Sequence, residues 1–587
     1  MAEYNQYDPF YKTPQGALRQ GEKACFRICA PEFESVSLTL QEDGSDASFC
    51  HEMRLIGDGV FEVRLSIAQT GLYYYAFLGK NGQMARPVMR QGEQMHQDNM
   101  WQLLVYAQDF ETPDWIKGGV IYQIFVDRFA KEGKTQPKPD VIMRDDWGGV
   151  PYYRQNAQGK VENRDFFGGN LEGIIGKLPY LAAFSVTAIY LSPIFDAHSN
   201  HKYDTGDYMN IDSMFGTEEQ FVRLIAKAAE YGIKIICDGV FSHTGDDSIY
   251  FNKYGHYDSV GAYQSKESPC FRWYSFENWN EDYDCWWGIK ILPQVNETEP
   301  DYLEFITGEG GVLDKWTRMG VSWRLDVADE LPDLFLDSLR MRVKKVNPDA
   351  LIIGEVWEDA STKSAYGRRR RYLQGAQLDS VMNYPFKEGI IGYLKSGDAT
   401  RLSRIVEDII GNYPACVLHS LMNIIGTHDT ERILTVLGSE KLPGDKIEME
   451  HFKLSQEQYE TGKKLLKIAA LLQFTLPGVP SIYYGDEAGM QGCCDPFNRI
   501  CYPWGEQDRE LMEWYAYLGK LRKDNRVFVQ GNYQTLYARG TVLVYQRTQE
   551  NSVVLVATNA SDQPFCGQIA GAQIELGAYE CRVLVRK

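Results

Sequence analysis

Residues 320–330, GVSWRLDVADE, form an apolar run that stops at a carboxylate, Asp326. Two later stretches repeat this pattern: residues 351–359, LIIGEVWED, with Glu355, and residues 423–432, NIIGTHDTER, with Asp429. Each run has the length and composition of a short buried strand. Parallel strands that end in ionisable side chains deliver them to the carboxyl-end rim of a barrel, where active sites form. The three acids together therefore predict an enzyme.

Strand-like and helix-like stretches alternate through the middle of the chain. The strand-like runs are VIYQIFVDRF (120–129), VTAIYLSPIF (186–195), IKIICDGVF (233–241), VSWRLDVAD (321–329), ALIIGEVW (350–357), LDSVMNYPF (378–386), SLMNIIGTHD (420–429) and PSIYYGDEA (480–488). The clearest helix is 217–232, because Thr217 with Gln220 fits a capping box and Gly232 supplies a stop. Eight such pairs over roughly 400 residues predict an α/β fold, a (β/α)8 TIM barrel.

Segments of β type flank the predicted barrel. Residues 24–106 alternate short β-rich runs with turn residues, and the runs TVLVYQR and SVVLVATN follow the last helix. We therefore predict an N-terminal β-sandwich at 1–113, the barrel at 114–525 and a C-terminal β-sandwich at 526–587; the resemblance described below implies that the N-terminal sandwich is of carbohydrate-binding type. Residues 244–300, rich in Tyr, Trp, Asp and Asn, are too many for a plain loop. We expect them to form an inserted lobe after the third strand, over the active-site face.

Composition and charge narrow the classes of partner. A net charge of −19 argues against nucleic acid, because nucleic-acid binders usually carry a basic footprint. We find no run of about 18 apolar residues and no apolar leader, so we expect no membrane partner and no standard export signal. The 12 cysteines are scattered, several of them in strand-like runs where a reduced thiol serves as a small hydrophobe. These features favour a cytoplasmic protein with a neutral partner.

Several motifs in a fixed order carry a family resemblance. They are GGVIYQIFVDRF, FFGGNLEGI, HKYDTGDY, CDGVFSH, LPQVN, GVSWRLDVADE, GEVW, GTHDTER and GVPSIYYGDE. Across roughly residues 20–587 the chain resembles the α-amylase family of retaining glycoside hydrolases. Within that family it resembles the neopullulanase, cyclomaltodextrinase and amylopullulanase group, most specifically in GVSWRLDVADE and LPQVN.

The resemblance implies a role for each acid. Asp326 would be the nucleophile that forms a covalent glycosyl-enzyme intermediate, and Glu355 the general acid that then acts as base. Asp429 would be the third acid, which grips sugar hydroxyls as the ring distorts. Arg324 lies two residues before Asp326 and so points to the same strand face, where we expect its positive charge to hold Asp326 ionised at neutral pH.

The resemblance also implies a set of substrate-binding residues. Besides Arg324, they are His243, His428, Tyr203, Trp357, Asp495 and Arg499. The two histidines would hydrogen-bond sugar hydroxyls, and Tyr203 would be an aromatic platform for the same sugar. Asp238 would organise the site, and Trp286 and Trp287 would line neighbouring sugar positions or pack in the interior.

Three departures from the family pattern bear on calcium. The loop after DRF reads AKEGK (130–134), where calcium-binding relatives carry Asn and Asp; Asn170 replaces an Asp, and Ser242 stands where many relatives have Asn. Calcium needs several oxygen ligands with net negative charge, and two lysines oppose that. We therefore predict no metal ligands and no certain cofactor, with Ca2+ disfavoured.

The run Arg368 to Arg371 follows the fifth predicted strand. Four consecutive arginines on a loop most simply form a solvated basic surface. We expect no binding role for them.

The leading hypothesis is an α-glucan glycosidase that cleaves α-1,4 bonds in maltodextrins, pullulan, cyclodextrins or starch, and α-1,6 cleavage is left open. Glu330 in DVADE favours this group over strict α-amylases. A glucan transglycosylase would share the covalent intermediate, and longer products from maltotriose would distinguish it. A non-catalytic glucan-binding or transport-associated protein would be expected to lose one or more of the acids, yet all three are present. By resemblance, the N-terminal domain binds glucan or packs across the active site of a homodimer partner.

Overall fold

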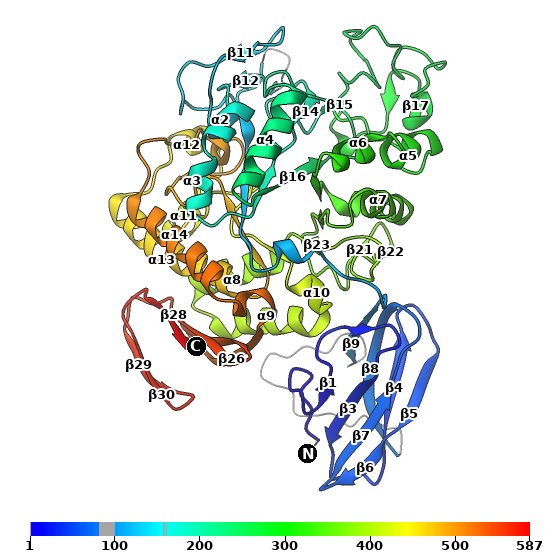
Figure 1. The fold of residues 1–587 in the computed structure, drawn as a ribbon, viewed down its shortest axis with the longest axis vertical. Helices are drawn as coiled ribbons and strands as arrows, with labels where there is room; N and C mark the ends of the chain where they lie inside the picture. The colour runs from blue at the N-terminus through cyan, green and yellow to red at the C-terminus, as the bar shows by residue number, and fades with distance from the viewer. Residues whose placement is uncertain (1, 81–99, 157–158, 160, 587) are drawn as a thin grey trace.

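A computed structural model describes residues 2–80, 100–156, 159 and 161–586 of the chain (Figure 1). Two packed sheets at the N-terminus are followed by a barrel with its helices and then by further sheets at the C-terminus. In Figure 1 the N-terminal sheets and the C-terminal sheets lie below the barrel on opposite sides. The predicted domain ranges also include residues 1, 81–99, 157, 158, 160 and 587, which lie outside the described residues, and their exact bounds stay a prediction.

A parallel barrel of eight strands forms the centre of the molecule. The strands are β10 (Ile121–Ile124), β13 (Ala188–Leu191), β16 (Lys234–Gly239), β19 (Ser322–Leu325), β20 (Ile352–Gly354), β23 (Ser380–Val381), β24 (Met422–Asn423) and β25 (Val479–Tyr483). Their order is β23-β20-β19-β16-β13-β10-β25-β24, and a parallel bridge between Met382 and Met422 joins the two ends. Seven strands lie within predicted runs and β25 begins one residue before its run, which confirms the TIM barrel.

Helices surround the barrel and alternate with its strands. They are α1 (Val126–Phe129), α2 (Leu171–Gly176), α3 (Leu178–Ala183), α4 (Glu218–Glu230), α5 (Pro300–Thr307), α6 (Val312–Arg318), α7 (Asp333–Val346), α8 (Tyr384–Ser396), α9 (Ala399–Asn412), α10 (Ala415–Leu418), α11 (Ile433–Gly438), α12 (Lys446–His451), α13 (Gln456–Thr475), α14 (Arg509–Asp524) and α15 (Val527–Gln530). The capping box predicted for α4 is present, because Thr217 and Gln220 bond reciprocally. Gly232 follows with φ +72°, which suits glycine.

The strand pleat explains how the barrel is filled. Successive side chains on a strand point to opposite faces, so one set fills the barrel and the other faces the helices. Ile121, Tyr190, Ile236 and Ile353 belong to one buried cluster that also includes residues of β24 and β25. Intervening residues such as Ile189 belong to the large cluster shared with the helices. The layer of the barrel interior that these residues form is thus apolar.

The N-terminal region is a sandwich of two antiparallel-rich sheets. One sheet has the order β1-β3-β7-β6 and the other β2-β9-β8-β4-β5. Their strands are β1 (Lys12–Thr13), β2 (Leu18–Arg19), β3 (Ala24–Cys29), β4 (Val36–Glu42), β5 (Ser48–Glu52), β6 (Arg54–Gly57), β7 (Val60–Leu65), β8 (Gly71–Gly79) and β9 (Trp101–Tyr106). Phe26, Tyr75 and Trp101 are buried in one cluster that both sheets share. The predicted N-terminal sheet domain is confirmed.

The C-terminal region is a four-stranded sheet with a hairpin packed on it. The sheet order is β26-β27-β28-β31, and β29 pairs with β30. The strands are β26 (Asn532–Arg539), β27 (Val542–Gln549), β28 (Ser552–Asn559), β29 (Phe565–Ile569), β30 (Ala572–Leu576) and β31 (Cys581–Arg586). Val544 of the sheet and Ile574 of the hairpin share a small buried cluster. The predicted C-terminal β region is confirmed.

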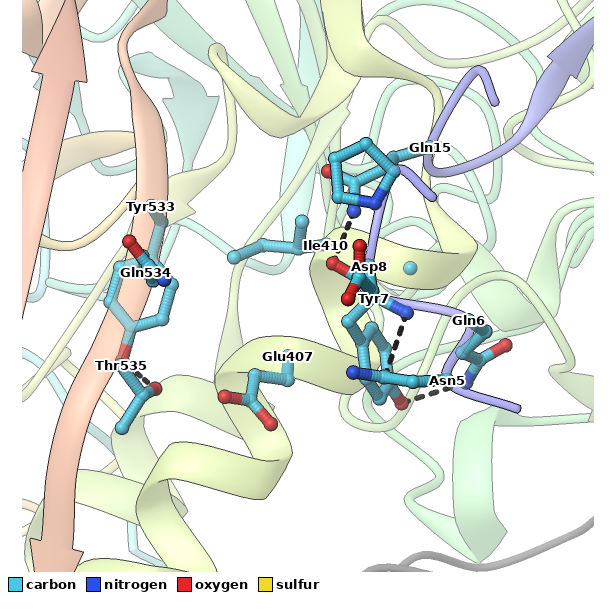
Figure 2. Close-up of a pocket in the computed structure, with 12 residues that line it drawn as sticks. Asn5, Gln6, Tyr7, Asp8, Gln15, Glu407, Ile410, Tyr533, Gln534 and Thr535 are labelled. Carbon is cyan, nitrogen blue, oxygen red and sulfur yellow. Dashed lines mark hydrogen bonds between the residues drawn. The ribbon is translucent and has the colours of Figure 1, made fainter. Parts of the chain in front are cut away.

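The three regions meet around a groove at the base of the barrel (Figure 2). The N-terminal segment, helix α9 and strand β26 line a cavity of about 240 Å³. The Tyr7 hydroxyl donates to Asp408 Oδ1 at 2.5 Å, and the Ser403 hydroxyl lies 2.8 Å from that of Thr535. Side-chain hydrogen bonds therefore connect the N-terminal segment and β26 to the same helix.

A segment between β16 and β19 carries its own small elements. They are η3 (Phe271–Trp273), β17 (Phe276–Asn278), β18 (Asp282–Tyr283) and η4 (Trp286–Gly288), before α5 and α6 return the chain to the barrel. His243 and Gln294, near the two ends of this segment, form an antiparallel bridge. The segment thus leaves and re-enters the barrel at one point, as expected for an inserted lobe.

Candidate active site

The predicted site residues meet in one pocket at the carboxyl ends of the barrel strands. The pocket has a volume of about 800 Å³. Asp326 follows β19 and Glu355 follows β20, whereas Asp429 lies on the loop after β24. The other predicted residues that line it are Tyr203, His243, Trp357, His428, Asp495 and Arg499. Trp286 and Trp287 line it as well.

Arg324 lies beneath the pocket and holds three carboxylates together. Its side chain is fully buried, with Nη1 2.8 Å from Asp238 Oδ1 and 2.9 Å from Asp326 Oδ1. Its Nη2 lies 2.7 Å from Glu355 Oε2. The terminal nitrogens of one planar guanidinium are close together, so this side chain fixes the Asp326 and Glu355 carboxyl groups near each other.

Burial governs the charge of Asp326 more than Arg324 does. The pKa of Asp326 is raised well above its usual value, first because the carboxyl is buried. The negative charges of Glu355, Asp238 and Asp429 add to this rise, and Arg324 opposes it. The expectation that Arg324 alone keeps Asp326 ionised is therefore too simple, because Asp238 and Glu355 share the same guanidinium.

Glu355 is held by two further donors. The Val327 N–H donates to Glu355 Oε2 at 2.9 Å, and Trp357 Nε1 donates to Oε1 at 3.0 Å. Val327 has φ +35° and ψ +62°, a left-handed conformation that is strained for a β-branched residue. The strained backbone at Val327, directly after Asp326, thus places its N–H group within hydrogen-bonding distance of Glu355.

The Trp357 ring forms part of the pocket wall. It is 53% exposed and stacks on Tyr384 at 4.9 Å between ring centroids, with 8° between the planes. One ring face is therefore packed on the protein, while the indole N–H reaches Glu355.

The two histidines and Tyr203 form one hydrogen-bonded group. The Tyr203 hydroxyl lies 2.8 Å from Asp238 Oδ2 and 2.5 Å from His428 Nε2, and the Tyr203 and His428 rings are parallel. His243 Nε2 lies 3.1 Å from the Tyr203 carbonyl, and its Nδ1 lies 2.9 Å from Ser242 Oγ. Burial lowers the pKa of His243 to about 4 and that of His428 well below its usual value. Both rings are therefore neutral near pH 7, and a sugar hydroxyl would share or replace their present hydrogen bonds.

Arg499 connects the third acid to the pocket wall. Its Nη1 lies 3.0 Å from Asp495 Oδ1 and its Nη2 3.3 Å from Asp429 Oδ1. The Asp429 side chain is 30% exposed, more than the side chains of Asp326 and Glu355. Asp429 is thus the acid most open to a ligand.

Comparison with known proteins agrees with this geometry. Residues 123–513 match the family model described as alpha amylase, catalytic domain. The chain belongs to the α-amylase family. An amylopullulanase from Thermoanaerobacterium saccharolyticum is 34% identical over 95% of this chain and 48% of its own length. The chain therefore spans about half the length of that α-amylase-family relative.

Two further similarities cover most of both proteins. Neopullulanase 2 from Thermoactinomyces vulgaris is 32% identical over 91% of this chain and 84% of its own length. A solved cyclomaltodextrinase structure superposes with a TM-score of 0.68 at 27% identity, over 95% of this chain and 92% of that chain. The similarity thus extends across the sheets that flank the α-amylase barrel.

Several pocket residues of this α-amylase-family chain were missed in the sequence. They include Asn163, His201, Ile289, Asp329, Lys363 and Tyr366. His201 stands in the motif HKYDTGDY, so its position offered a signal. Lys363 and Tyr366 follow no apolar run, and only the folded loop brings them to the pocket.

Of the four consecutive arginines only Arg368 is exposed, so the expectation of a solvated basic surface is wrong for the other three. Arg370 is 5% exposed, and its guanidinium donates to the carbonyls of Leu331 and Ala328. Arg369 pairs with Asp43, and Arg371 pairs with Asp337. Local acids and carbonyls on three neighbouring segments draw these side chains inward.

The residues at the position of the family's calcium do not fit that ion. Asn170 Oδ1 accepts from the N–H groups of Gly173 and Glu132, and its Nδ2 donates to the Glu132 carbonyl. The polar atoms of this amide are thus already bonded to backbone groups. Lys138 Nζ lies between Asp196 Oδ1 and Asp212 Oδ2, at 2.5 and 2.6 Å. Within the described part of the chain, no group of three or more His, Cys, Asp or Glu side chains is arranged to hold a metal ion.

Proposed function

We propose that the chain is a retaining glycoside hydrolase that cleaves α-1,4 bonds in maltodextrins, pullulan and cyclodextrins. One observation carries the proposal: Arg324 holds Asp326 and Glu355 side by side in a pocket that Asp429 also lines. Retaining hydrolysis needs two carboxyl groups close together, one to attack the anomeric carbon and one to protonate the oxygen of the glycosidic bond. The names of the relatives support the choice of substrates.

The two acids would act in two steps. Asp326 attacks the anomeric carbon while Glu355 gives its proton to the glycosidic oxygen, so the C–O bond breaks and the leaving sugar departs. Glu355, now a carboxylate, takes a proton from water, and the resulting hydroxide attacks the same carbon and releases Asp326. Arg324 positions both carboxyl groups through the two steps.

The other residues would hold the sugar whose bond is cut. Asp429 and Arg499 face the pocket from the loops after β24 and β25, where carboxylate oxygens and N–H groups can bond sugar hydroxyls. His243, His428 and Tyr203 face it from the loops after β16, β24 and β13. Together they would distort the ring toward the oxocarbenium-like transition state.

A parallel incubation of the purified chain with pullulan, β-cyclodextrin and soluble starch tests the proposal. We expect pullulan to be hydrolysed, with panose as the product of α-1,4 cleavage and maltotriose as the product of α-1,6 cleavage. Asp326→Asn is the matched control for contaminating activity. Rapid loss of starch with intact pullulan and cyclodextrin would exclude this group, and no hydrolysis of any substrate would refute the function. Products longer than maltotriose from maltotriose would show transfer in place of hydrolysis.

Two finer statements belong to the same proposal. The 12 cysteines are all free, which supports a reducing, cytoplasmic location. No helix in the described residues has the length and apolar character to cross a membrane.

We also propose a homodimer through the N-terminal domain, by analogy with the family group. Sedimentation of the whole chain tests it, and a monomer at micromolar concentration would refute it.

A further inference from the structure

Two exposed aromatic rings at the mouth of the pocket share one carboxylate. Trp287 is 76% exposed and Tyr366 is 70% exposed, and both line the pocket. Trp287 Nε1 donates to Glu330 Oε1 at 3.2 Å, and the Tyr366 hydroxyl donates to the same oxygen at 2.5 Å. Exposed apolar groups that lie together at the mouth of a pocket often mark a ligand contact, whereas isolated ones do not.

The three residues stand on one side of the barrel. Trp287, Glu330 and Tyr366 lie on the loops after β16, β19 and β20, which are neighbouring strands. Tyr203, Asp429 and Arg499 lie on the loops after β13, β24 and β25, on the other side. Glu355 ends β20 and protonates the oxygen of the leaving sugar in the proposed mechanism. The side of Trp287 and Tyr366 is therefore the side on which the leaving sugar sits.

The backbone presents both rings in an uncommon conformation. Trp287 has φ +48° and Tyr366 has φ +51°, in the left-handed region that large side chains rarely adopt. Such residues persist where surrounding contacts impose them, and they cluster at functional sites. For both residues, one of those contacts is the hydrogen bond to Glu330.

The N-terminal domain anchors the hairpin that carries Tyr366. The hairpin pairs β21 (Ser364–Ala365) with β22 (Arg368–Arg369), and Tyr366 lies at its turn. Arg369 Nε donates to Asp43 Oδ2 at 2.8 Å, and Gln102 Nε2 donates to Ser361 Oγ at 2.8 Å. Asp43 and Gln102 both belong to the N-terminal sandwich, which lies directly below the hairpin in Figure 1.

We propose that Tyr366 determines specificity by stacking on the glucose of the leaving group, and that the N-terminal domain holds it there through the Asp43–Arg369 pair. This inference rests on the proposed hydrolase function. The C–H face of a glucose ring packs well on an aromatic ring, and a fixed ring gives more binding than a mobile one. Glu330 and Asp43 together fix Tyr366 from its hydroxyl end and from the base of its hairpin.

The test compares two substrates that differ only on the leaving side. The leaving group of maltotetraose is a sugar, which occupies that side of the pocket. The leaving group of α-maltosyl fluoride is fluoride, so no sugar ring lies there. We expect Tyr366→Ala to lower kcat/KM about tenfold on maltotetraose and less than about twofold on α-maltosyl fluoride. Tyr366→Phe, which keeps the ring but loses the bond to Glu330, should fall between Tyr366→Ala and the unmodified chain. Tyr231→Ala, which removes an exposed tyrosine at the C-terminal end of helix α4, should leave kcat/KM unchanged on both substrates.

The role of the N-terminal domain is tested in the same assay. Asp43→Ala should lower kcat/KM on maltotetraose about threefold and leave α-maltosyl fluoride unchanged. Arg27→Met is the matched control, because it breaks an ion pair with Glu62 at 2.8 Å within the same domain. An equal loss on both substrates would show a merely structural role for Tyr366, and no loss on either would refute the contact. If the unmodified chain cleaves neither substrate, the proposed function itself fails.

Discussion

Replacing Arg324 with methionine would leave three buried carboxylates without their cation. The Arg324 side chain is fully buried, and its guanidinium lies within 2.9 Å of the carboxylates of Asp238, Asp326 and Glu355. Removing one partner of a buried ion pair costs about 3–5 kcal/mol. For a barrel of roughly 400 residues that unfolds as one unit, this corresponds to a Tm lower by about 3–6 °C.

The loss of stability should depend on pH. Without Arg324 the pKa values of Asp238 and Asp326, already raised by burial, rise further above their unfolded values, so both carboxyls carry a proton to higher pH in the folded state. A carboxyl with a raised pKa supports folding below its unfolded pKa and loses that contribution as pH rises through the folded value. The Tm difference between Arg324→Met and the unmodified chain should therefore be larger at pH 8 than at pH 5.

Calorimetry and kinetics together separate charge from geometry. Arg324→Lys keeps the charge but has one nitrogen in place of a fork, so it should regain much of the stability while kcat/KM on maltotetraose stays about 100-fold low. Arg318→Met, at a pair with Asp314 that is 61% exposed on the arginine side, should change stability by about 0–1 kcal/mol. A Tm for Arg324→Met that equals the unmodified value at pH 8, or full activity of Arg324→Lys, would refute the reasoning.

Three further outcomes follow from the site. Asp326→Asn and Glu355→Gln should each lower turnover of maltotetraose at least about 1000-fold with the circular dichroism spectrum unchanged, because each removes a group that the two-step mechanism cannot replace. More than about one percent residual activity in Asp326→Asn would contradict its assignment as the nucleophile. Asp238→Asn removes a negative charge that raises the pKa of Asp326, and it leaves Arg324 free to stabilise the Asp326 carboxylate. The acid limb of the pH profile of kcat/KM should therefore move to lower pH. A move to higher pH would contradict the coupling between Asp238 and Asp326. EDTA should change Tm and activity little, since Asn170 and Lys138 leave no fitting ligand set; a drop of several degrees that added Ca2+ restores would reveal an unrecognised site.

The barrel and its acids were predictable because both depend on local periodicity. Asp326 and Glu355 directly follow apolar strands, and the carboxyl ends of parallel strands meet at one rim. Asp429 lies six residues beyond the end of β24 as the structure has it, but within the predicted apolar run. In each case the sequence neighbours carry the information.

The rest of the site depends on contacts between distant segments. Tyr366 lies between two-residue strands with no apolar period, and its position comes from Glu330 and the N-terminal domain. Arg370 is buried because carbonyls of residues about 40 positions earlier accept from it. The pKa of Asp326 likewise reflects acids from three other loops or strands. Neither composition nor spacing records such contacts.

The ring of the barrel closes unevenly. Between β23 and β24 only the bridge of Met382 and Met422 pairs the backbone, and side chains supply the remaining closure: Asn383 Nδ2 donates to Asn423 Oδ1 at 2.9 Å, and Ser380 Oγ donates to the Ser420 carbonyl at 2.6 Å. Backbone hydrogen bonds do not depend on side-chain identity, but these two bonds require the side chains of Asn383, Asn423 and Ser380. Single substitutions of Asn383, Asn423 or Ser380 would therefore weaken the closure of the barrel at this seam.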